Sequence, residues 1–139
     1  MPWTQKEFSL KPQQHGYHLI TKEVVAALPE IKTYQVGILH LFIKHTSAAL
    51  TLNENCDPDV RRDLKTSISR IVPEGDFYLH ADEGPDDMPA HVKSSLIGTS
   101  LSIPITNGKL QLGTWQGIYL CEFRARTHTR RIVATINGD

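Results

Sequence analysis

Cysteine is scarce in this sequence, which narrows the redox chemistry open to the chain. Only Cys56 and Cys121 occur among the 139 residues, and no C-x-x-C pair is present. Sequence alone leaves a disulfide between the two open. Residues 1–10, MPWTQKEFSL, lack the basic and then apolar pattern of a secretion signal, so we expect both cysteines to be free thiols.

Long apolar runs and an excess of either charge are absent. The apolar stretches are far too short to cross a bilayer, so we expect a cytoplasmic protein with no membrane partner. The 15 lysines and arginines equal the 15 aspartates and glutamates in number. This balance gives no electrostatic reason to expect nucleic acid as a partner.

The motifs of several common enzyme classes are also missing. The chain has no P-loop and no dinucleotide-binding glycine pattern, and residues 98–104, GTSLSIP, differ from the G-x-S-x-G motif. The zinc motif H-E-x-x-H and the calcium-loop pattern are absent too. A functional site must therefore be sought outside these motifs.

The residues that are present suit one folded domain. Hydrophobic residues make up 40% of the sequence, and we find no internal repeat and no linker. A chain of this length can bury a real core. We therefore expect a single domain that spans residues 1–139.

The first third of the chain predicts strands around one helix. Alternating polar and apolar residues favour strands over 4–10 and 17–20. Thr21 is placed to cap a helix over 22–31. The run of β-branched and large apolar residues that follows predicts a buried strand over 33–44.

The middle of the chain predicts one more strand and two helices. Residues 48–53 have the composition of a strand. The pair Asp57-Pro58 is typical of a helix start, and we expect that helix to run to Val72. Pro89 opens a shorter helix that Gly98 closes.

The last third predicts antiparallel strands and sets the fold class. Asn107-Gly108 joins the apolar stretches 100–105 and 109–113, which indicates a β-hairpin with a type I′ turn. Two further strands are expected over 117–126 and 130–136. We therefore predict an α+β fold, with an antiparallel sheet curled into a sandwich or partial barrel and two or three flanking helices.

The segment 80–91, HADEGPDDMPAH, is the first candidate site. His80 and His91 lie far enough apart for a loop to bring them together, and a third ligand such as His45 or a carboxylate could complete a site for zinc or another divalent ion. The alternative is a solvated acidic loop before the next helix, where the negative charges of Asp86 and Asp87 are favourable.

Two further segments carry polar groups suited to a ligand. In 44–55, hydroxyl, amide and carboxylate groups at strand ends could hold a phosphate, or they could simply form turns. In 113–124, Trp115 could stack on a flat heterocycle whose edge Gln116 reads, or it could cover the core edge. The candidate ligand contacts in segment 44–55 are His45, Thr46, Ser47, Asn53 and Glu54.

Arginines near the C-terminus allow a second kind of phosphate contact. Arg124 lies two residues from Glu122 on the expected strand, so a surface ion pair between them is one expectation. Guanidinium groups bind phosphate through paired hydrogen bonds. The alternative is a charged edge strand that resists aggregation. The arginines concerned are Arg124, Arg126, Arg130 and Arg131.

Three long blocks carry a resemblance to a known family. They are HTSAALTLNENCDPDVRRDL at 45–64, DEGPDDMPAHVKSSLIGTSL at 82–101 and LGTWQGIYLCEFR at 112–124. These blocks resemble the YjbQ-like family, also called secondary thiamine-phosphate synthases, over nearly the whole chain. The residues in matching blocks are His45, Thr46, Ser47, Asn53, Glu54, Asp57, His80, Asp87, His91, Ser94, Ser95, Thr114, Trp115, Gln116 and Glu122.

The resemblance implies a fold, an assembly and an activity. It implies a compact α+β domain that assembles as a homotrimer. It also implies a weak thiamine-phosphate synthase activity, which joins a pyrimidine methyl diphosphate to a thiazole phosphate and releases pyrophosphate. One position departs from the family, because Phe123 stands where a histidine is common.

These observations together give a working hypothesis of a transferase acting on a phosphorylated small molecule. His45, His80 and His91 are expected to hold zinc, magnesium or phosphate, and Asp87 or Glu54 to orient a histidine. The alternatives are a non-catalytic trimer that binds a metal or a phosphorylated metabolite, and a metal-dependent hydrolase. Substrate contacts are expected from Thr46, Ser47, Asn53, Thr114, Trp115, Gln116 and Arg124.

Overall fold

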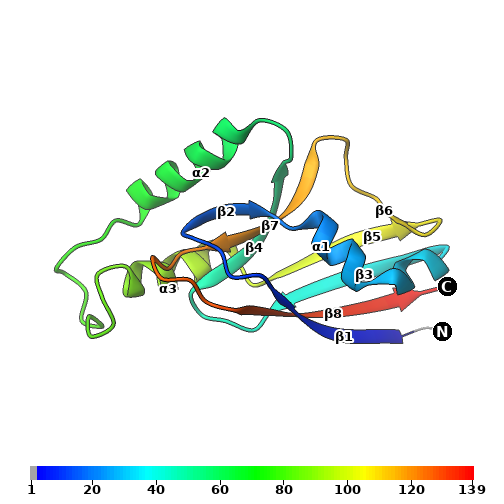
Figure 1. Cartoon of the computed structure of the whole chain (residues 1–139), viewed down its shortest axis with the longest axis horizontal. Helices are drawn as coiled ribbons and strands as arrows, with labels where there is room; N and C mark the ends of the chain where they lie inside the picture. The colour runs from blue at the N-terminus through cyan, green and yellow to red at the C-terminus, as the bar shows by residue number, and fades with distance from the viewer. Residues whose placement is uncertain (1–2) are drawn as a thin grey trace.

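Two antiparallel sheets curl against each other in the computed structural model, which describes residues 3–139 (Figure 1). The larger sheet has the order β1-β8-β3-β5-β6, and the smaller has the order β2-β7-β4. This arrangement confirms the expected α+β class with a curled antiparallel sheet. The larger sheet comprises β1 (Trp3–Leu10), β8 (Arg130–Gly138), β3 (Val36–Ile43), β5 (Ser100–Thr106) and β6 (Lys109–Leu110), and the smaller comprises β2 (Gly16–Leu19), β7 (Gln116–Glu122) and β4 (Ala48–Glu54).

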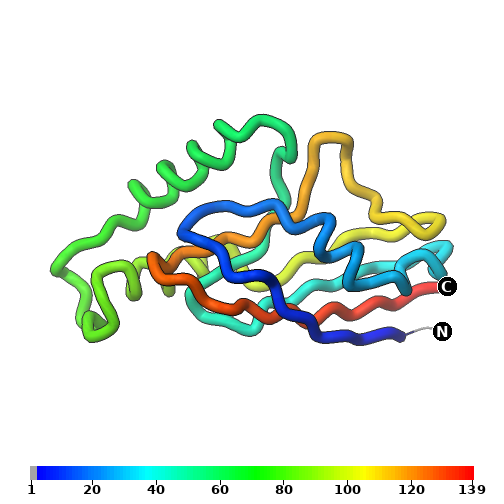
Figure 2. The backbone as a smooth tube through the Cα atoms, viewed as in Figure 1, coloured from blue at the N-terminus to red at the C-terminus, as the bar shows by residue number. Residues whose placement is uncertain are grey.

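The first and last strands lie side by side in the larger sheet. Trp3 pairs with Asn137 and Leu10 with Arg130, so the start of β1 and the end of β8 lie together at one end of the molecule, as the tube in Figure 2 shows. β8 also pairs with β3 on its other side. The alternative interpretation of the C-terminal arginines as a charged edge strand is therefore wrong for Arg130 and Arg131, because β8 lies between β1 and β3.

The first helix is shorter than expected because a proline ends it. α1 (Thr21–Ala27) stops before Leu28, and a 3₁₀ turn, η1 (Pro29–Thr33), follows. Proline disfavours helical backbone in the residue before it. Thr21 does not cap this helix, since its hydroxyl accepts a hydrogen bond from the backbone N–H of Ile118 at 2.9 Å.

The other two helices begin and end through local chemistry. α2 (Pro58–Ile71) starts as expected, with the Asp57 side chain accepting a hydrogen bond from the Asp59 N–H at 2.9 Å. α3 (Asp87–Ile97) begins two residues before Pro89, which the first turn tolerates because its N–H groups need no helical partner. Gly98 follows α3 with a φ of 109°.

The hairpin between β5 and β6 has the expected turn. Asn107 has φ 50° and Gly108 has φ 76°, the positive angles that a type I′ turn requires at both central residues. The second strand is shorter than the expected 109–113, because β6 contains only Lys109–Leu110.

The main core fills the space between the two sheets. Alternate side chains of β3, such as Leu39 and Leu41, meet Ile118 and Leu120 of β7, and all four are essentially unexposed. A second cluster, including Tyr119 of β7, packs against α2 and α3. This packing fixes α3 against the start of β4.

One further expectation, that of two free cysteines, is met among the described residues. Cys56 and Cys121 are both free thiols, the first exposed and the second buried. Within residues 3–139, every helix is too short or too polar to cross a membrane.

Candidate metal centre

Three side chains with metal-ligating chemistry meet at the start of α3. Asp87 opens the helix and His91 follows one turn later, so both lie on one face. His80 reaches them from the preceding loop. One ligand atom from each residue lies within 4.8 Å of the other two, and the two imidazole ring centroids are 5.5 Å apart.

Asp87 is the centre of this cluster. Its side chain is 1% exposed, with Oδ2 2.8 Å from Nε2 of His80 and Oδ1 3.4 Å from Nε2 of His91. Arg124 donates to Oδ1 at 2.8 Å. A buried carboxylate is costly unless it is paired, and here a guanidinium and an imidazole pair with it.

The hydrogen bond on the far side of His91 fixes the role of its Nε2. Nδ1 of His91 lies 2.9 Å from the carbonyl oxygen of Thr46, which can only accept, so Nδ1 carries a hydrogen. In the neutral ring, Nε2 then presents a lone pair to Oδ1 of Asp87. Two acceptor atoms that face each other repel, and a cation between them, either a proton or a metal ion, removes this repulsion.

The spacing of the cluster suits one ion. Two donor atoms that each lie ~2.1 Å from a metal, at ~90–110° to each other, are roughly 3.0–3.4 Å apart. The separation between His91 Nε2 and Asp87 Oδ1 is 3.4 Å, within this range, whereas His80 Nε2 and Asp87 Oδ2 are 2.8 Å apart, slightly closer because they form a direct hydrogen bond. His80 is 51% exposed, so the cluster is open to solvent on its side and could accept a further ligand. Two histidines and one carboxylate suit zinc, manganese or iron better than magnesium.

Arg124 joins two neighbouring carboxylates to the end of β7. Its Nε donates to Asp86 at 2.9 Å, and a second nitrogen donates to the Glu83 carbonyl at 3.1 Å. Burial favours a higher pKa for Asp86, but hydrogen bonds from the Ala125 N–H and from Arg124 outweigh it and hold this pKa below its ordinary value. The surface pair expected between Arg124 and Glu122 is therefore wrong, as is a purely solvent-facing or helix-capping Asp86.

A buried ion pair lies beside this cluster. Glu122 and Arg130 are 0% and 3% exposed, and the guanidinium Nε donates to Glu122 at 2.7 Å. A further nitrogen of Arg130 donates to the Ser47 hydroxyl at 3.0 Å. The burial of Arg130 in this pair excludes it as a phosphate contact, whereas Arg126 and Arg131 are exposed and Arg124 is partly buried.

A polar cavity of about 490 Å³ adjoins the cluster through Arg124. Its remaining lining residues are Glu83, Arg126, Thr127 and His128. Two arginines and a histidine give this cavity the donors that an anionic ligand requires.

His45 lies outside the three-residue cluster, which contains Asp87 in its place. Nε2 of His45 accepts a hydrogen bond from the Arg131 N–H at 2.8 Å. Burial, followed by the nearby charge of Arg130, lowers the pKa of His45 and favours its neutral form. The neutral ring suits its role as an acceptor. Thr46 contacts the cluster through its carbonyl oxygen, whereas the Ser47 hydroxyl accepts a hydrogen bond from Arg130 in the neighbouring buried ion pair.

The other expected substrate contacts gather at the opposite end of β4. Antiparallel pairing places Ala48 beside Glu122 and Glu54 beside Gln116. A rise of ~3.3 Å per residue puts these two ends of β4 about 20 Å apart. Asn53, Glu54, Thr114, Trp115 and Gln116 therefore form a separate group, in which Trp115 is 63% exposed.

Several of these distal residues have structural hydrogen bonds. The Glu54 carboxylate accepts from the Asp57 N–H at 3.1 Å, and the Gln116 side chain accepts from the Gly113 N–H at 2.8 Å. Near the cluster, Ser94 donates to the Ala48 carbonyl at 2.7 Å. Phe123 is buried against Tyr17 in the second core cluster.

Two basic residues with buried nitrogen atoms were not among the candidates from the sequence. Lys93 is 5% exposed, with Nζ 3.4 Å from the Ser69 hydroxyl and 5.7 Å from the centre of the Phe123 ring. His15 has a buried Nε2 without a hydrogen-bond partner in the described part of the chain. Neither carries a sequence signal, because burial of a lysine or histidine follows from tertiary packing.

Comparison with known sequences identifies related proteins along the whole chain. A family model described as UPF0047 protein YjbQ-like matches residues 6–139. The UPF0047 protein YjbQ of Escherichia coli O157:H7 is 49% identical over 137 residues, which cover 99% of each chain. The UPF0047 protein YugU of Bacillus subtilis is 42% identical over 112 residues, covering 79% of this chain and 82% of that one.

Solved structures show the same architecture. An uncharacterized yjbq/upf0047 protein from Clostridium acetobutylicum has a TM-score of 0.80 at 40% identity, covering 92% of this chain and 97% of that one. A YbjQ-like protein of unknown function from Sulfolobus solfataricus P2 has a TM-score of 0.85 at 24% identity, covering 99% and 98%. The second likeness concerns the fold alone.

Proposed function

Because this chain belongs to the UPF0047 YjbQ-like family, and because His80, Asp87 and His91 form a cluster suited to one cation, we propose that it is a metal-dependent enzyme acting on a phosphorylated small molecule. The observation that carries this proposal is the position of His91 Nε2, which faces Oδ1 of Asp87 at 3.4 Å while the Thr46 carbonyl binds Nδ1 on the other side of the ring. A divalent ion held there would supply positive charge to a phosphate group.

The reaction proposed is that of a thiamine-phosphate synthase, which the sequence resemblance implies. The thiazole nitrogen forms a bond to the methylene carbon of the pyrimidine methyl diphosphate. The carbon–oxygen bond breaks, and pyrophosphate leaves with its electron pair. No covalent nucleophile is needed, so positioning of the two substrates and neutralisation of the leaving group supply the catalysis.

The residues around the cluster have distinct roles in this proposal. His80 and His91 are ligands, and the Thr46 carbonyl fixes the ring orientation of His91. Arg124 holds Asp87 in place. Arg126 and His128 line the polar cavity where the leaving phosphates would bind.

We also propose that three copies assemble, as the resemblance implies. The outer face of the larger sheet carries Trp3, Val36, Ile38 and Phe42, which are 63%, 66%, 53% and 44% exposed. Such a surface is typical of a subunit interface. Gln116 pairs with Glu54, at the end of β4 about 20 Å from the end that packs against α3, so Gln116 and the adjacent Trp115 can serve the same site only if a neighbouring copy brings them there.

Metal binding is tested by titrating the purified, chelator-treated protein with Zn²⁺ or Mn²⁺ in a calorimeter. We expect one site per chain, lost in His91→Ala and retained in His40→Ala, whose ring lies on the outer face of the larger sheet. Equal metal binding in both variants would exclude the cluster as the site.

The reaction is tested by following pyrophosphate release with both substrates and the metal. Release that requires the thiazole phosphate supports the transferase. Release from the diphosphate alone indicates a hydrolase, which the open, solvent-exposed side of the cluster would also suit. Metal and diphosphate binding without any release indicates a binding protein and contradicts the enzyme.

A further inference from the structure

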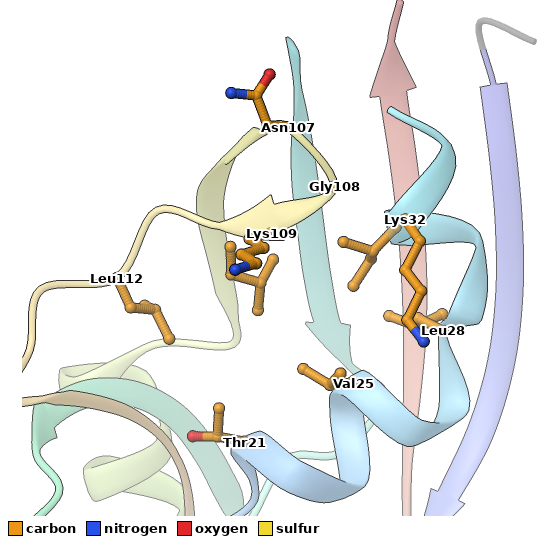
Figure 3. Close-up of a pocket in the computed structure, with 10 residues that line it drawn as sticks. Thr21, Val25, Leu28, Lys32, Asn107, Gly108, Lys109 and Leu112 are labelled. Carbon is orange, nitrogen blue, oxygen red and sulfur yellow. The ribbon is translucent and has the colours of Figure 1, made fainter. Parts of the chain in front are cut away.

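A second cavity, of about 520 Å³, lies between α1 and the β5–β6 hairpin (Figure 3). Its apolar wall consists of side chains from α1, η1 and the hairpin, and Figure 3 shows Val25 and Leu112 directed into the space from opposite sides. Val25 is 41% exposed, so this wall is reached from solvent. The apolar lining residues are Val25, Leu28, Ile31, Leu110 and Leu112.

The cavity is preformed because both of its walls are anchored. The hairpin tip is tied to η1 and the residues after it, since Asn107 donates its N–H to Gln35 at 2.7 Å and Gly108 to Tyr34 at 2.8 Å. A Cβ on Gly108 would lie 2.9 Å from the Lys32 carbonyl, so glycine permits this close approach. On the other side, Thr21 joins α1 to β7. A fixed apolar wall lowers the cost of binding a ligand.

The charges at this cavity have one sign. Among the lining residues that the structure describes, Lys32 and Lys109 are the only charged ones, and none is an aspartate or glutamate. Neither lysine forms an ion pair within residues 3–139, whereas Lys6 and Lys44 are each paired with a glutamate. An apolar cavity with two uncompensated ammonium groups is complementary to an apolar ligand with an anionic end.

We infer that this cavity binds an amphipathic anion, such as a medium-chain carboxylate or a hydrophobic phosphate ester. The apolar part of the ligand lies against Val25, Leu28 and Leu112, and its anionic group meets Lys32 and Lys109. The site is separate from the metal cluster, because α1 and β6 lie toward one end of the long axis of the molecule and α3 toward the other (Figure 1). This inference does not depend on the proposed transferase activity.

Binding is tested by calorimetric titration of the full chain with decanoate, using 1-decanol as a neutral ligand of the same chain length. We expect decanoate to bind at least about tenfold more tightly than decanol, because a charge-assisted contact is lost with the alcohol. Equal affinities for the two, or no binding of decanoate, would overturn the inference.

Two pairs of variants locate the site. Val25→Trp fills the cavity and should weaken decanoate binding at least about tenfold, whereas Ala26→Trp, on an exposed neighbour outside the lining, should not. The double variant Lys32→Glu with Lys109→Glu should remove the preference for decanoate over decanol, and Lys11→Glu should keep it. Leu112→Trp, on the hairpin wall, replaces Val25→Trp if that variant does not fold. Unchanged affinity in the folded filling variant contradicts the site.

The remaining possible occupant is a second copy of the chain. Light scattering of Val25→Trp measures the mass of the assembly directly. A lower mass for this variant than for Ala26→Trp, together with no decanoate binding to the original protein, would assign the cavity to a subunit contact and refute the ligand site.

Discussion

His91 and Asp87 face each other across one turn of α3, with Nε2 of the histidine 3.4 Å from Oδ1 of the aspartate. The histidine is fixed from behind by the Thr46 carbonyl at 2.9 Å, and the aspartate by the guanidinium of Arg124 at 2.8 Å. The two ligand atoms are thus held in place before any cation binds. This preorganisation is what a metal site requires of the residues around its ligands.

Asp87→Asn should separate metal binding from structure at this cluster. The amide keeps the size of the side chain but removes the charge that a metal and Arg124 both require. We expect at least about a hundredfold loss of Zn²⁺ affinity, measured by competition with a chromophoric chelator. The unfolding free energy should fall by about 1–3 kcal/mol, because the Arg124 guanidinium loses one of its two carboxylate partners and keeps Asp86.

The matched control for Asp87→Asn is His80→Gln. His80 is half exposed, and the glutamine amide can still donate a hydrogen bond to Asp87, so this variant should lose metal affinity with little change in stability. Loss of stability without loss of metal affinity in Asp87→Asn would make the aspartate purely structural.

The buried pair between Glu122 and Arg130 is expected to behave as a unit. Glu122→Gln or Arg130→Met alone should each cost about 3–5 kcal/mol in unfolding free energy, because either change leaves an unpaired buried charge or polar group. The double variant should cost much less than the sum. Denaturant unfolding of the two single variants and the double variant measures this coupling, and additive losses would show that the two side chains act independently.

The sequence predicts the parts of this fold that depend on neighbouring residues. Asp57-Pro58 starts α2 and Asn107-Gly108 turns the hairpin, because capping and positive φ are local properties. The loop that brings His80 to His91 was also anticipated, since ten intervening residues with glycine and proline allow the chain to return.

Two other features could not be predicted in the same way. They are the pairing of strands that are distant in the sequence and the residue at which each strand ends. Strand alternation placed Glu122 and Arg124 on one face, but β7 ends at Glu122 and the chain then turns Arg124 toward Asp86. The register of β4 against β7 likewise separates Trp115 from the histidines. His45 was grouped with them because it ends a strand, yet its ring bonds to the Arg131 N–H.

His15 should make the stability of the protein depend on pH. Burial lowers the pKa of His15 below its ordinary value of 6.5; the charges of Lys93 and Lys65 act in the same direction, and those of Asp86 and Glu122 oppose it. The unfolded chain therefore binds a proton near pH 6.5 that the folded chain does not. Unfolding free energy should fall as the pH drops below about 6.5, until the folded-state pKa is reached.

The substitution His15→Phe tests this source of pH dependence. Phenylalanine removes the titrating ring and the buried nitrogen that lacks a partner, so stability at neutral pH should be kept or increased. The decline in unfolding free energy between about pH 7 and pH 5 should become shallower, with a remainder from His45, whose pKa burial also lowers. An identical decline in both proteins would assign the pH dependence to other groups.

The outer face of the larger sheet should hold the assembly together. Trp3 of β1 and Ile38 of β3 lie in one row across β8, because both pair with Asn137, and both are more than half exposed. Ile38→Glu places a charge in the middle of this apolar row, so burial against another copy would become costly. Light scattering should show a trimer for the original protein and a smaller species for Ile38→Glu. Ile71→Glu makes the same change at a 69% exposed isoleucine on α2, and it should leave the trimer intact. A trimer that persists in Ile38→Glu would place the interface on another surface.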